Sequence, residues 1–300
     1  MITGILNVYK EKGYTSHDVV AKLRGIVGQK KIGHTGTLDP EAEGVLPVCL
    51  GRATKVCDLL TDKDKVYEAV LRLGKETDTQ DMTGTVLREQ EVPEDEEAVR
   101  KAILSFEGDY EQVPPMYSAL KVNGQKLCDL ARKGIEVERK ARNVSIYEIT
   151  ITKIDLPRVY FCVHCSKGTY IRTLCHDIGR KIGCGGCMEG LKRTAVESFD
   201  EKDALTLAQI EEKKKVGELE TILYPVDFVF ASLPKAVVSK EFSKLLYNGN
   251  RLRTEFFLEP LTLNKTENIR VYDEKEQFVG IYCYSRQTKD YKPIKIFLER

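Results

Sequence analysis

The residues best suited to chemistry lie in one loop, where residues 33–47 read GHTGTLDPEAEGVLP. The glycines and prolines do not suit a helix or a central strand, so the backbone must follow tight, individually specified turns. The loop carries Asp39 between Leu38 and Pro40, with His34 upstream. An aspartate before proline often starts a turn, whereas a carboxylate on a rigidly held loop can act as a nucleophile or base. Local chemistry leaves both interpretations open.

The loop resembles, almost letter for letter, the signature loop of the TruB-type tRNA pseudouridine synthases, in which one aspartate carries the chemistry. The resemblance covers about residues 3–230. Its other motifs are the Lys-x-Tyr strand at 65–67, TDTQDMTG at 77–84, GTYIR at 168–172 and LKRT at 191–194. It implies an α+β fold, with a mixed, largely antiparallel catalytic sheet flanked by helices. The implied activity is isomerisation of uridine 55 in the tRNA T loop to pseudouridine.

This isomerisation breaks the bond from C1′ to the base nitrogen, rotates the detached base and rejoins it through carbon. A carboxylate can attack or stabilise an electron-poor carbon without a cofactor, as glycosidase carboxylates do. We therefore expect Asp39 to be the catalytic carboxylate and expect no metal or cofactor. Whether Asp39 attacks the sugar or the base ring stays open at this point.

Matching motifs suggest partners for this carboxylate. Arg172 has a permanent charge and a bidentate fork, so it can keep Asp39 ionised and aimed. Tyr67 can offer a flat face to a base taken out of its stack, and its hydroxyl can move a proton. By resemblance, the other substrate contacts are Tyr170, Leu191 and His34, the last of which touches displaced loop nucleotides by stacking or through a phosphate.

Two positions depart from the family pattern. Residues 10–16 read KEKGYTS, so Glu11 stands where the family has a proline. We expect this change to loosen the turn slightly without touching a catalytic group. Cys187 replaces a histidine that is common before the LKRT segment, and because cysteine is also compact, we expect an effect on local packing only.

Charge is unevenly distributed along the chain. The formal net charge is +1, yet residues 121–193 carry 15 Lys and Arg against 7 Asp and Glu, while residues 61–120 carry 7 against 15. A basic block can be an ordinary solvated surface or a phosphate-binding face. The resemblance makes residues 112–142 an insertion that grips RNA. The cations expected to bind RNA there are Lys121, Lys126, Arg132 and Lys133.

Hydrophobic periodicity predicts the elements that hold these residues. A helix capped by Ser16 runs to Gly28, and another begins after Tyr170 and ends at Gly183. Alternation over 64–74 predicts a strand with Tyr67 on its apolar face. Further strands are expected at 2–9, 45–51, 144–154 and 158–165, and further helices at 53–60, after Pro93, at 126–133 and at 205–223.

The texture changes to short strands and turns from about Pro234. We therefore expect a catalytic domain over residues 1–231 and a small β-barrel-like domain over 232–300. The second weakly resembles a PUA-like RNA-binding domain, and a generic small β domain is the alternative.

The nine cysteines include two pairs, Cys162-x-x-Cys165 and Cys184-x-x-Cys187, with the spacing of a zinc module. However, residues three apart in a strand face opposite sides of the sheet, so the first pair cannot share one ion. Zinc is therefore set aside. Free thiols, the lack of a signal-peptide core and the lack of a membrane-length apolar run predict a cytoplasmic protein.

A noncatalytic RNA-binding or RNA-folding protein is the competing hypothesis, since it would use the same basic groove and C-terminal domain. Asp39, Tyr67 and Arg172 together favour the enzyme, because binding alone needs no buried carboxylate facing RNA phosphates. The expected partner is the T stem-loop of tRNA. We expect a monomer that needs no protein partner.

Overall fold

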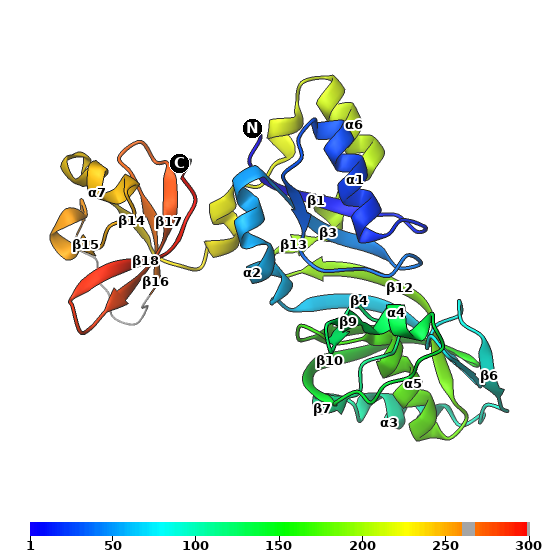
Figure 1. The fold of residues 1–300 in the computed structure, drawn as a ribbon. Helices are drawn as coiled ribbons and strands as arrows, with labels where there is room; N and C mark the ends of the chain where they lie inside the picture. Colours follow the sequence, from blue (N-terminus) through cyan, green and yellow to red (C-terminus); the bar gives the residue numbers. More distant parts are fainter. Residues whose placement is uncertain (260–267, 299–300) are drawn as a thin grey trace.

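The computed structural model describes residues 1–259 and 268–298. Within these ranges a large sheet with flanking helices is followed by a separate five-stranded sheet (Figure 1). The predicted α+β class is thus confirmed. The predicted C-terminal domain includes residues 260–267 and 299–300, which lie outside the described residues, and its boundary near residue 232 stays a prediction. No helix among the described residues is long and apolar enough to cross a membrane.

The large sheet is mixed. Its main path, in spatial order, is β1 (Gly4–Lys10), β3 (Glu43–Leu50), β12 (Gly186–Val196), β4 (Lys65–Leu73), β11 (Arg158–Cys165), β10 (Arg142–Asp155) and β7 (Gly108–Gln112). At its side, β2 (Ile32–His34) pairs with β3, and β13 (Phe199–Asp200) pairs with β12. The β3–β12 pair is parallel, and the other pairs along this path are antiparallel. This is the mixed, largely antiparallel sheet that the resemblance implied.

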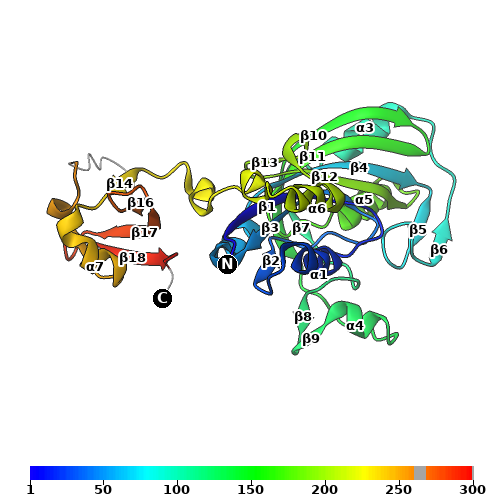
Figure 2. The ribbon, with the colours of Figure 1, turned by 90° about the horizontal axis from the view of Figure 1, so that it is seen from above.

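Helices cover the two halves of the sheet separately (Figures 1 and 2). α1 and α6 pack together beside β1, and α3 and α5 pack against the half that holds β4, β10 and β12. Their hydrophobic cores are also distinct. The helices are α1 (Ser16–Val27), α2 (Cys57–Thr61), α3 (Glu96–Leu104), α4 (Leu127–Ala131), α5 (Ile171–Ile182), α6 (Leu207–Lys215) and α7 (Ser243–Tyr247).

The predicted start of α1 is wrong by one residue. Thr15 is the N-cap and forms a capping box with Asp18, whereas the Ser16 side chain turns inward and is fully buried. A capping box satisfies two free N–H groups at once, which leaves Ser16 available for another contact. The predicted ends hold, because Gly28 and Gly183 close α1 and α5 in the left-handed conformation.

Two other predicted helices are too long. The chain at 121–126 forms a hairpin of β8 (Lys121–Val122) and β9 (Gln125–Lys126), because Asn123 and Gly124 both have positive φ, as a tight hairpin turn requires. Only Leu127–Ala131 remains for α4. In the second case α6 ends at Lys215 because Gly217, at φ +81°, breaks it. A 3-10 turn at Leu219–Ile222 follows.

The second sheet runs in the order β14 (Lys235–Val237), β16 (Asn268–Tyr272), β17 (Phe278–Ser285), β18 (Asp290–Ile296) and β15 (Leu252–Arg253). It contacts the first through a cluster of aromatic rings in which Phe230 meets Phe278 and Phe297. Lys55 adds a polar link, since its Nζ donates to the carbonyl of Ile296 at 2.6 Å. A further two-stranded ribbon, β5 (Lys75–Thr77) with β6 (Val86–Glu89), extends from the end of β4.

Gly44 is the point where β3 passes closest to β12. Its φ is +105°, and a Cβ there would lie 2.2 Å from the carbonyl oxygen of Arg193. Both the backbone conformation and the approach of the strands therefore require glycine.

We predict that Gly44→Ala lowers the free energy of unfolding by about 2–4 kcal/mol, because strain and overlap add. Gly28→Ala is the matched control: φ is +78° there, but the added carbon meets open space, so about 1–2 kcal/mol is expected. Urea unfolding of both variants measures the difference. Equal losses would contradict the close approach at Gly44.

Candidate active site

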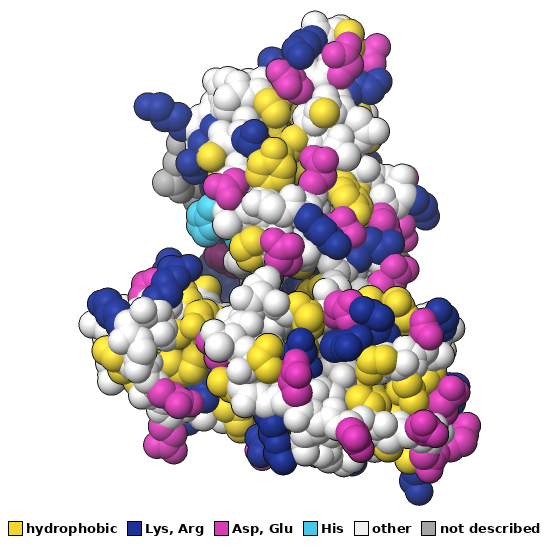
Figure 3. Space-filling view, turned by 90° about the vertical axis from the view of Figure 1, so that its right-hand side faces the viewer, with side chains coloured by type: hydrophobic (Ala, Val, Ile, Leu, Met, Phe, Trp, Pro, Cys, Tyr) yellow, Lys and Arg dark blue, Asp and Glu magenta, His cyan; other side chains and the backbone are white. Residues whose placement is uncertain are grey.

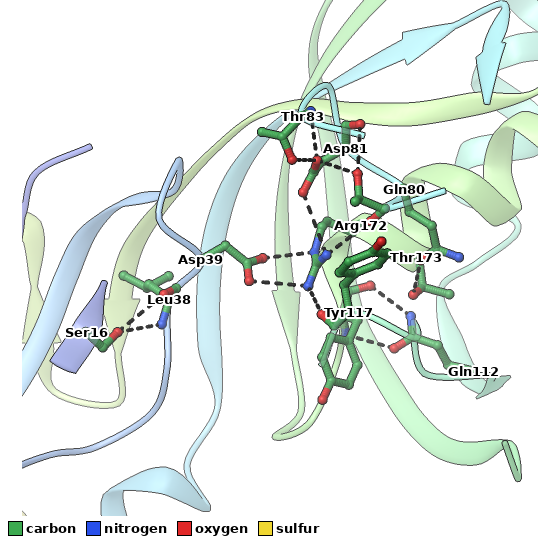
Figure 4. A network of polar contacts seen from close by, with 12 residues as sticks. Ser16, Leu38, Asp39, Gln80, Asp81, Thr83, Gln112, Tyr117, Arg172 and Thr173 are labelled. Atoms are coloured by element: carbon green, nitrogen blue, oxygen red, sulfur yellow. Dashed lines mark hydrogen bonds and ion pairs between the residues drawn. The ribbon is translucent and has the colours of Figure 1, made fainter. Parts of the chain in front are cut away.

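The loop that carries Asp39 runs from β2 to β3 and is fixed from several sides. The Ser16 hydroxyl accepts from the Leu38 N–H at 2.9 Å, next to Asp39 (Figure 4). The Nζ of Lys10, which is fully buried, donates to the carbonyls of Pro40 at 3.1 Å and Ala42 at 2.5 Å. The loop is therefore a rigid platform, as a catalytic carboxylate requires.

Asp39 and Arg172 meet as a bidentate ion pair. Nε of Arg172 lies 2.9 Å from Oδ2 of Asp39, and Nη2 donates to Oδ1 at 3.3 Å (Figure 4). The side chain of Arg172 is 6% exposed and that of Asp39 is 36% exposed. The guanidinium is thus buried beneath a carboxylate that still faces solvent. The structure brings together the two residues that we predicted as catalytic partners.

Arg172 is itself held by groups from two other segments. Its Nη1 donates to the Thr79 carbonyl at 3.1 Å, and its Nη2 donates to the Tyr117 carbonyl at 2.8 Å. A second carboxylate, Asp81, lies 3.7 Å from Nη1. The fork is therefore fixed in direction by three neighbours besides Asp39.

Asp81 was not among the residues predicted for the site. Its Oδ1 accepts from the hydroxyl of Thr79 at 2.7 Å and from the N–H of Thr83 at 2.9 Å, so the turn orients it toward Arg172. The signal in the sequence was the motif TDTQDMTG, whose last residue, Gly84, has no room for a Cβ beside Asp78.

Tyr67, Leu191 and Arg193 form the floor beside Asp39. In the β4–β12 ladder Tyr67 lies opposite Arg193 and Ala69 opposite Leu191, so these side chains share one face. Tyr67 and Leu191 are 8% and 9% exposed and belong to one apolar cluster with Leu38. Tyr67 and Leu191 therefore give the surface beside Asp39 an apolar character.

Arg193 was quoted in a sequence motif but was not predicted as a site residue. It is 1% exposed, and its Nε donates to the Val45 carbonyl at 2.7 Å. Its charge lowers the pKa of Tyr67, against the larger effect of burial. A buried guanidinium thus lies close to the Tyr67 hydroxyl.

The two remaining residues predicted to contact the substrate, Tyr170 and His34, lie in different segments of the chain. Tyr170 is the N-cap residue of α5, two residues before Arg172. His34 ends β2, where its Nδ1 accepts from the Gly36 N–H at 3.3 Å and its ring meets His17 edge-on at 5.2 Å. A cavity of about 490 Å³ opens beside His34, and its lining includes Arg24, Lys30 and Lys31.

The basic insertion stands apart from the sheet. In Figure 2, β8, β9 and α4 project from the body of the molecule. Figure 3 shows a hollow between an upper lobe, which holds α1 and α6, and a lower lobe, which holds α5. The four predicted RNA-binding cations, Lys121, Lys126, Arg132 and Lys133, are all exposed. Arg132 also lies 3.6 Å from Asp129.

Burial dominates the electrostatics of the site. It raises the pKa of Asp39, while Arg172 acts in the opposite direction. Burial likewise lowers the pKa of Lys10 to about 8. It lowers the pKa of His34, with His17 adding to the effect, so the His34 ring is neutral near pH 7. Burial raises the pKa of Tyr67, which keeps its hydroxyl protonated.

The described residues contain no group of three or more His, Cys, Asp or Glu that could hold a metal ion. Burial alternates along β11, with Cys165 buried and Cys162 only partly so, so these two thiols face opposite sides of the sheet. Cys187, at the position of the family's histidine, is fully buried, and its sulfur lies 3.6 Å from that of Met82.

Two family descriptions match adjoining parts of this chain. "TruB family pseudouridylate synthase (N terminal domain)" matches residues 24–171, and "tRNA pseudouridylate synthase B C-terminal domain" matches residues 172–231. A tRNA pseudouridine synthase B of Lachnoclostridium phytofermentans is 55% identical over 99% of this chain and 100% of its own. One of Alkaliphilus oremlandii is 48% identical over 98% and 97%.

Solved structures resemble the fold over nearly the whole chain. One is an H/ACA RNP bound to a substrate RNA containing 2′-deoxyuridine, with a TM-score of 0.74 and 26% identity, covering 99% of this chain and 86% of that chain. Another is a Cbf5-Nop10-Gar1 complex, with a TM-score of 0.74 and 28% identity, covering 99% and 85%.

The raised pKa of Asp39 has a measurable consequence for stability. A native pKa above the unfolded value of about 3.9 means that ionisation of Asp39 costs stability, and this cost develops as the pH rises through the native pKa. Asn has no such cost. We predict that the gap in stability between Asp39→Asn and the parent shifts in favour of the variant as the pH rises from about 4 to 7.

Thermal unfolding across this pH range measures the gap. Asp290→Asn is the control of opposite sign, because a hydrogen bond from Thr288 and the nearby Arg251 lower the pKa of Asp290. That variant should lose stability at neutral pH. A melting-temperature difference between Asp39→Asn and the parent that stays constant, or moves in favour of the parent, as the pH rises would contradict the predicted direction.

Proposed function

Because the chain belongs to the TruB family of tRNA pseudouridine synthases, we propose that it isomerises uridine 55 in the T loop of tRNA, with Asp39 as the catalytic carboxylate. The observation that carries the proposal is the Asp39–Arg172 ion pair, with a carboxylate that is 36% exposed above a guanidinium that is 6% exposed. An RNA-binding protein gains nothing from such a carboxylate, since it repels phosphate. A nucleophile needs this combination of access and fixed aim.

In the proposed reaction the target uridine leaves its stack and rests on Tyr67 and Leu191. Asp39 attacks an electron-poor carbon of the nucleotide, and the bond from C1′ to the base nitrogen breaks. The detached base rotates, a bond from C1′ to a ring carbon forms, and the bond between Asp39 and the nucleotide breaks, which regenerates the carboxylate. The ring carbon loses its proton, and the ring nitrogen freed from C1′ gains one. Arg172 keeps Asp39 ionised and oriented through the attack. A carboxylate can attack either a carbon of the sugar or a carbon of the base ring.

The pocket residues have distinct parts in this proposal. Tyr67 stacks on the base, and its hydroxyl, close to the charge of Arg193, transfers the proton that the nucleotide loses. Tyr170 bounds the pocket at the start of α5. His34 is neutral at pH 7 because burial lowers its pKa, which favours stacking on a displaced nucleotide over a charged contact with phosphate.

The binding surface in this proposal joins two basic regions. The exposed cations of the insertion bind the T-arm backbone, and Arg24, Lys30 and Lys31 at the cavity beside His34 bind phosphates of the loop. The enzyme works as a cytoplasmic monomer on the T stem-loop, without a protein partner, metal or cofactor. Residues 232–300 add RNA contacts as a PUA-like domain.

Asp39→Asn tests the catalytic assignment. The variant keeps the shape and hydrogen-bonding capacity of the side chain but removes the nucleophile, so we predict normal affinity for a T-arm stem-loop and complete loss of pseudouridine formation. Mapping of pseudouridine in the RNA after incubation measures this. Normal conversion by the variant would show that another group carries the chemistry.

Salt dependence tests the binding surface. Each cation that neutralises a phosphate contributes about 0.7–0.9 to the slope of log affinity against log salt. Neutralising Lys121, Lys126, Arg132 and Lys133 to Gln should therefore reduce the slope by about 3. The control is neutralisation of Lys213, Lys214 and Lys215 on α6, which should leave the slope nearly unchanged. An unchanged slope in the first variant would remove the insertion from the binding surface.

A further inference from the structure

The side chain of Gln112, at the end of β7, bonds to the backbone of Tyr170 on both sides. The Tyr170 N–H donates to Oε1 of Gln112 at 2.8 Å, and Nε2 of Gln112 donates to the Tyr170 carbonyl at 3.0 Å. The amide thus pairs with Tyr170 as a neighbouring strand would. Gln112 is 1% exposed, so water cannot replace either bond cheaply.

Two further hydrogen bonds determine which way this amide points. Nε2 of Gln112 also donates to the Tyr110 hydroxyl at 2.9 Å, and that hydroxyl donates to Oδ2 of Asp177 on α5 at 2.9 Å. The oxygen and both N–H groups of the amide are therefore engaged. A carboxylate at this place would face the Tyr170 carbonyl with a negative oxygen, so the chemistry requires an amide and not an acid.

The segment that Gln112 holds is the first turn of α5. Tyr170 is the N-cap residue, and its carbonyl accepts the N–H of Leu174 at 3.0 Å. Arg172 follows two residues later and reaches Asp39 at 2.9 Å. On the other side, the Thr173 hydroxyl donates to Oε1 of Gln80 at 2.7 Å (Figure 4). Displacement of Tyr170 therefore moves the Arg172 fork relative to Asp39.

We propose that Gln112 is a positioning residue for the reaction: through the Tyr170 backbone it sets the place of the Tyr170 ring and of the Arg172 guanidinium. This inference rests on the proposed catalytic role of the Asp39–Arg172 pair. A misplacement of about 1 Å in such a constellation can cost two orders of magnitude in rate. Gln112 is 1% exposed and bonds to Tyr110 and to the Tyr170 backbone rather than to Asp39 or Arg172, so we expect it to act on turnover and not on RNA affinity.

The test is Gln112→Glu, measured by single-turnover formation of pseudouridine in a tRNA transcript and by RNA binding. We expect the single-turnover rate constant to fall about 10- to 100-fold at pH 8, with Kd for the RNA unchanged, because two donors are lost and a charge faces a carbonyl. Burial raises the pKa of a glutamate at this place. At about pH 5.5 the protonated acid regains a donor, so the ratio of variant to parent rate should rise as the pH falls.

A lower rate at unchanged Kd is the readout that a purely structural defect would not give, and the rise in this ratio shows that the charge at position 112 is its cause. Gln209→Glu is the matched control: Gln209 completes the capping box of α6, a position where glutamate serves equally well, so its rate and pH profile should match the parent. An unchanged rate for Gln112→Glu would overturn the proposal. So would a loss that does not vary with pH, or a parallel loss of RNA affinity.

Tyr110→Phe decides the case if Gln112→Glu does not fold. It removes the oxygen that orients the Gln112 amide while leaving the bonds to Tyr170 possible. The single-turnover rate constant should therefore fall about 3- to 10-fold at unchanged Kd. An unchanged rate constant would overturn the proposal. The modified position is mapped in the parent enzyme. A parent product at another uridine would count against the proposed target but would leave the comparison of Gln112 variants intact.

Discussion

The ion pair between Asp39 and Arg172 is the interaction on which the site depends. Its two partners are 133 residues apart in the chain, one in a loop beside α1 and the other in the first turn of α5. Desolvation works against a charged Asp39, and the fixed fork of Arg172 works against desolvation. The surrounding structure must therefore hold both partners, because separation would remove the attraction that offsets the desolvation of Asp39.

Three constraints hold the pair in place. Ser16 and Lys10 fix the loop on the side of Asp39. The carbonyls of Thr79 and Tyr117 fix the guanidinium on the side of Arg172. The β4–β12 register supplies the floor, and because side chains alternate along a strand, a slip of one residue would turn Tyr67 away from the pocket.

The basic insertion takes part in holding Arg172. Tyr117 lies within it and accepts from Arg172, and Gln112, at its first residue, bonds to Tyr170. The residues proposed to bind RNA and residues that hold Arg172 thus share one segment of chain.

The sequence by itself determined the type of most elements, and it singled out Asp39 and Arg172 as a pair, because periodicity, glycine at helix ends and a long loop motif are local features. It did not determine the partners of buried polar groups. Ser16, predicted as a helix cap, instead accepts a hydrogen bond from the loop that carries Asp39. The contacts of Asp81, Arg193 and Gln112 depend on segments far away in the chain. Only strand register and helix docking bring such groups within hydrogen-bonding distance, so only the tertiary structure could decide them.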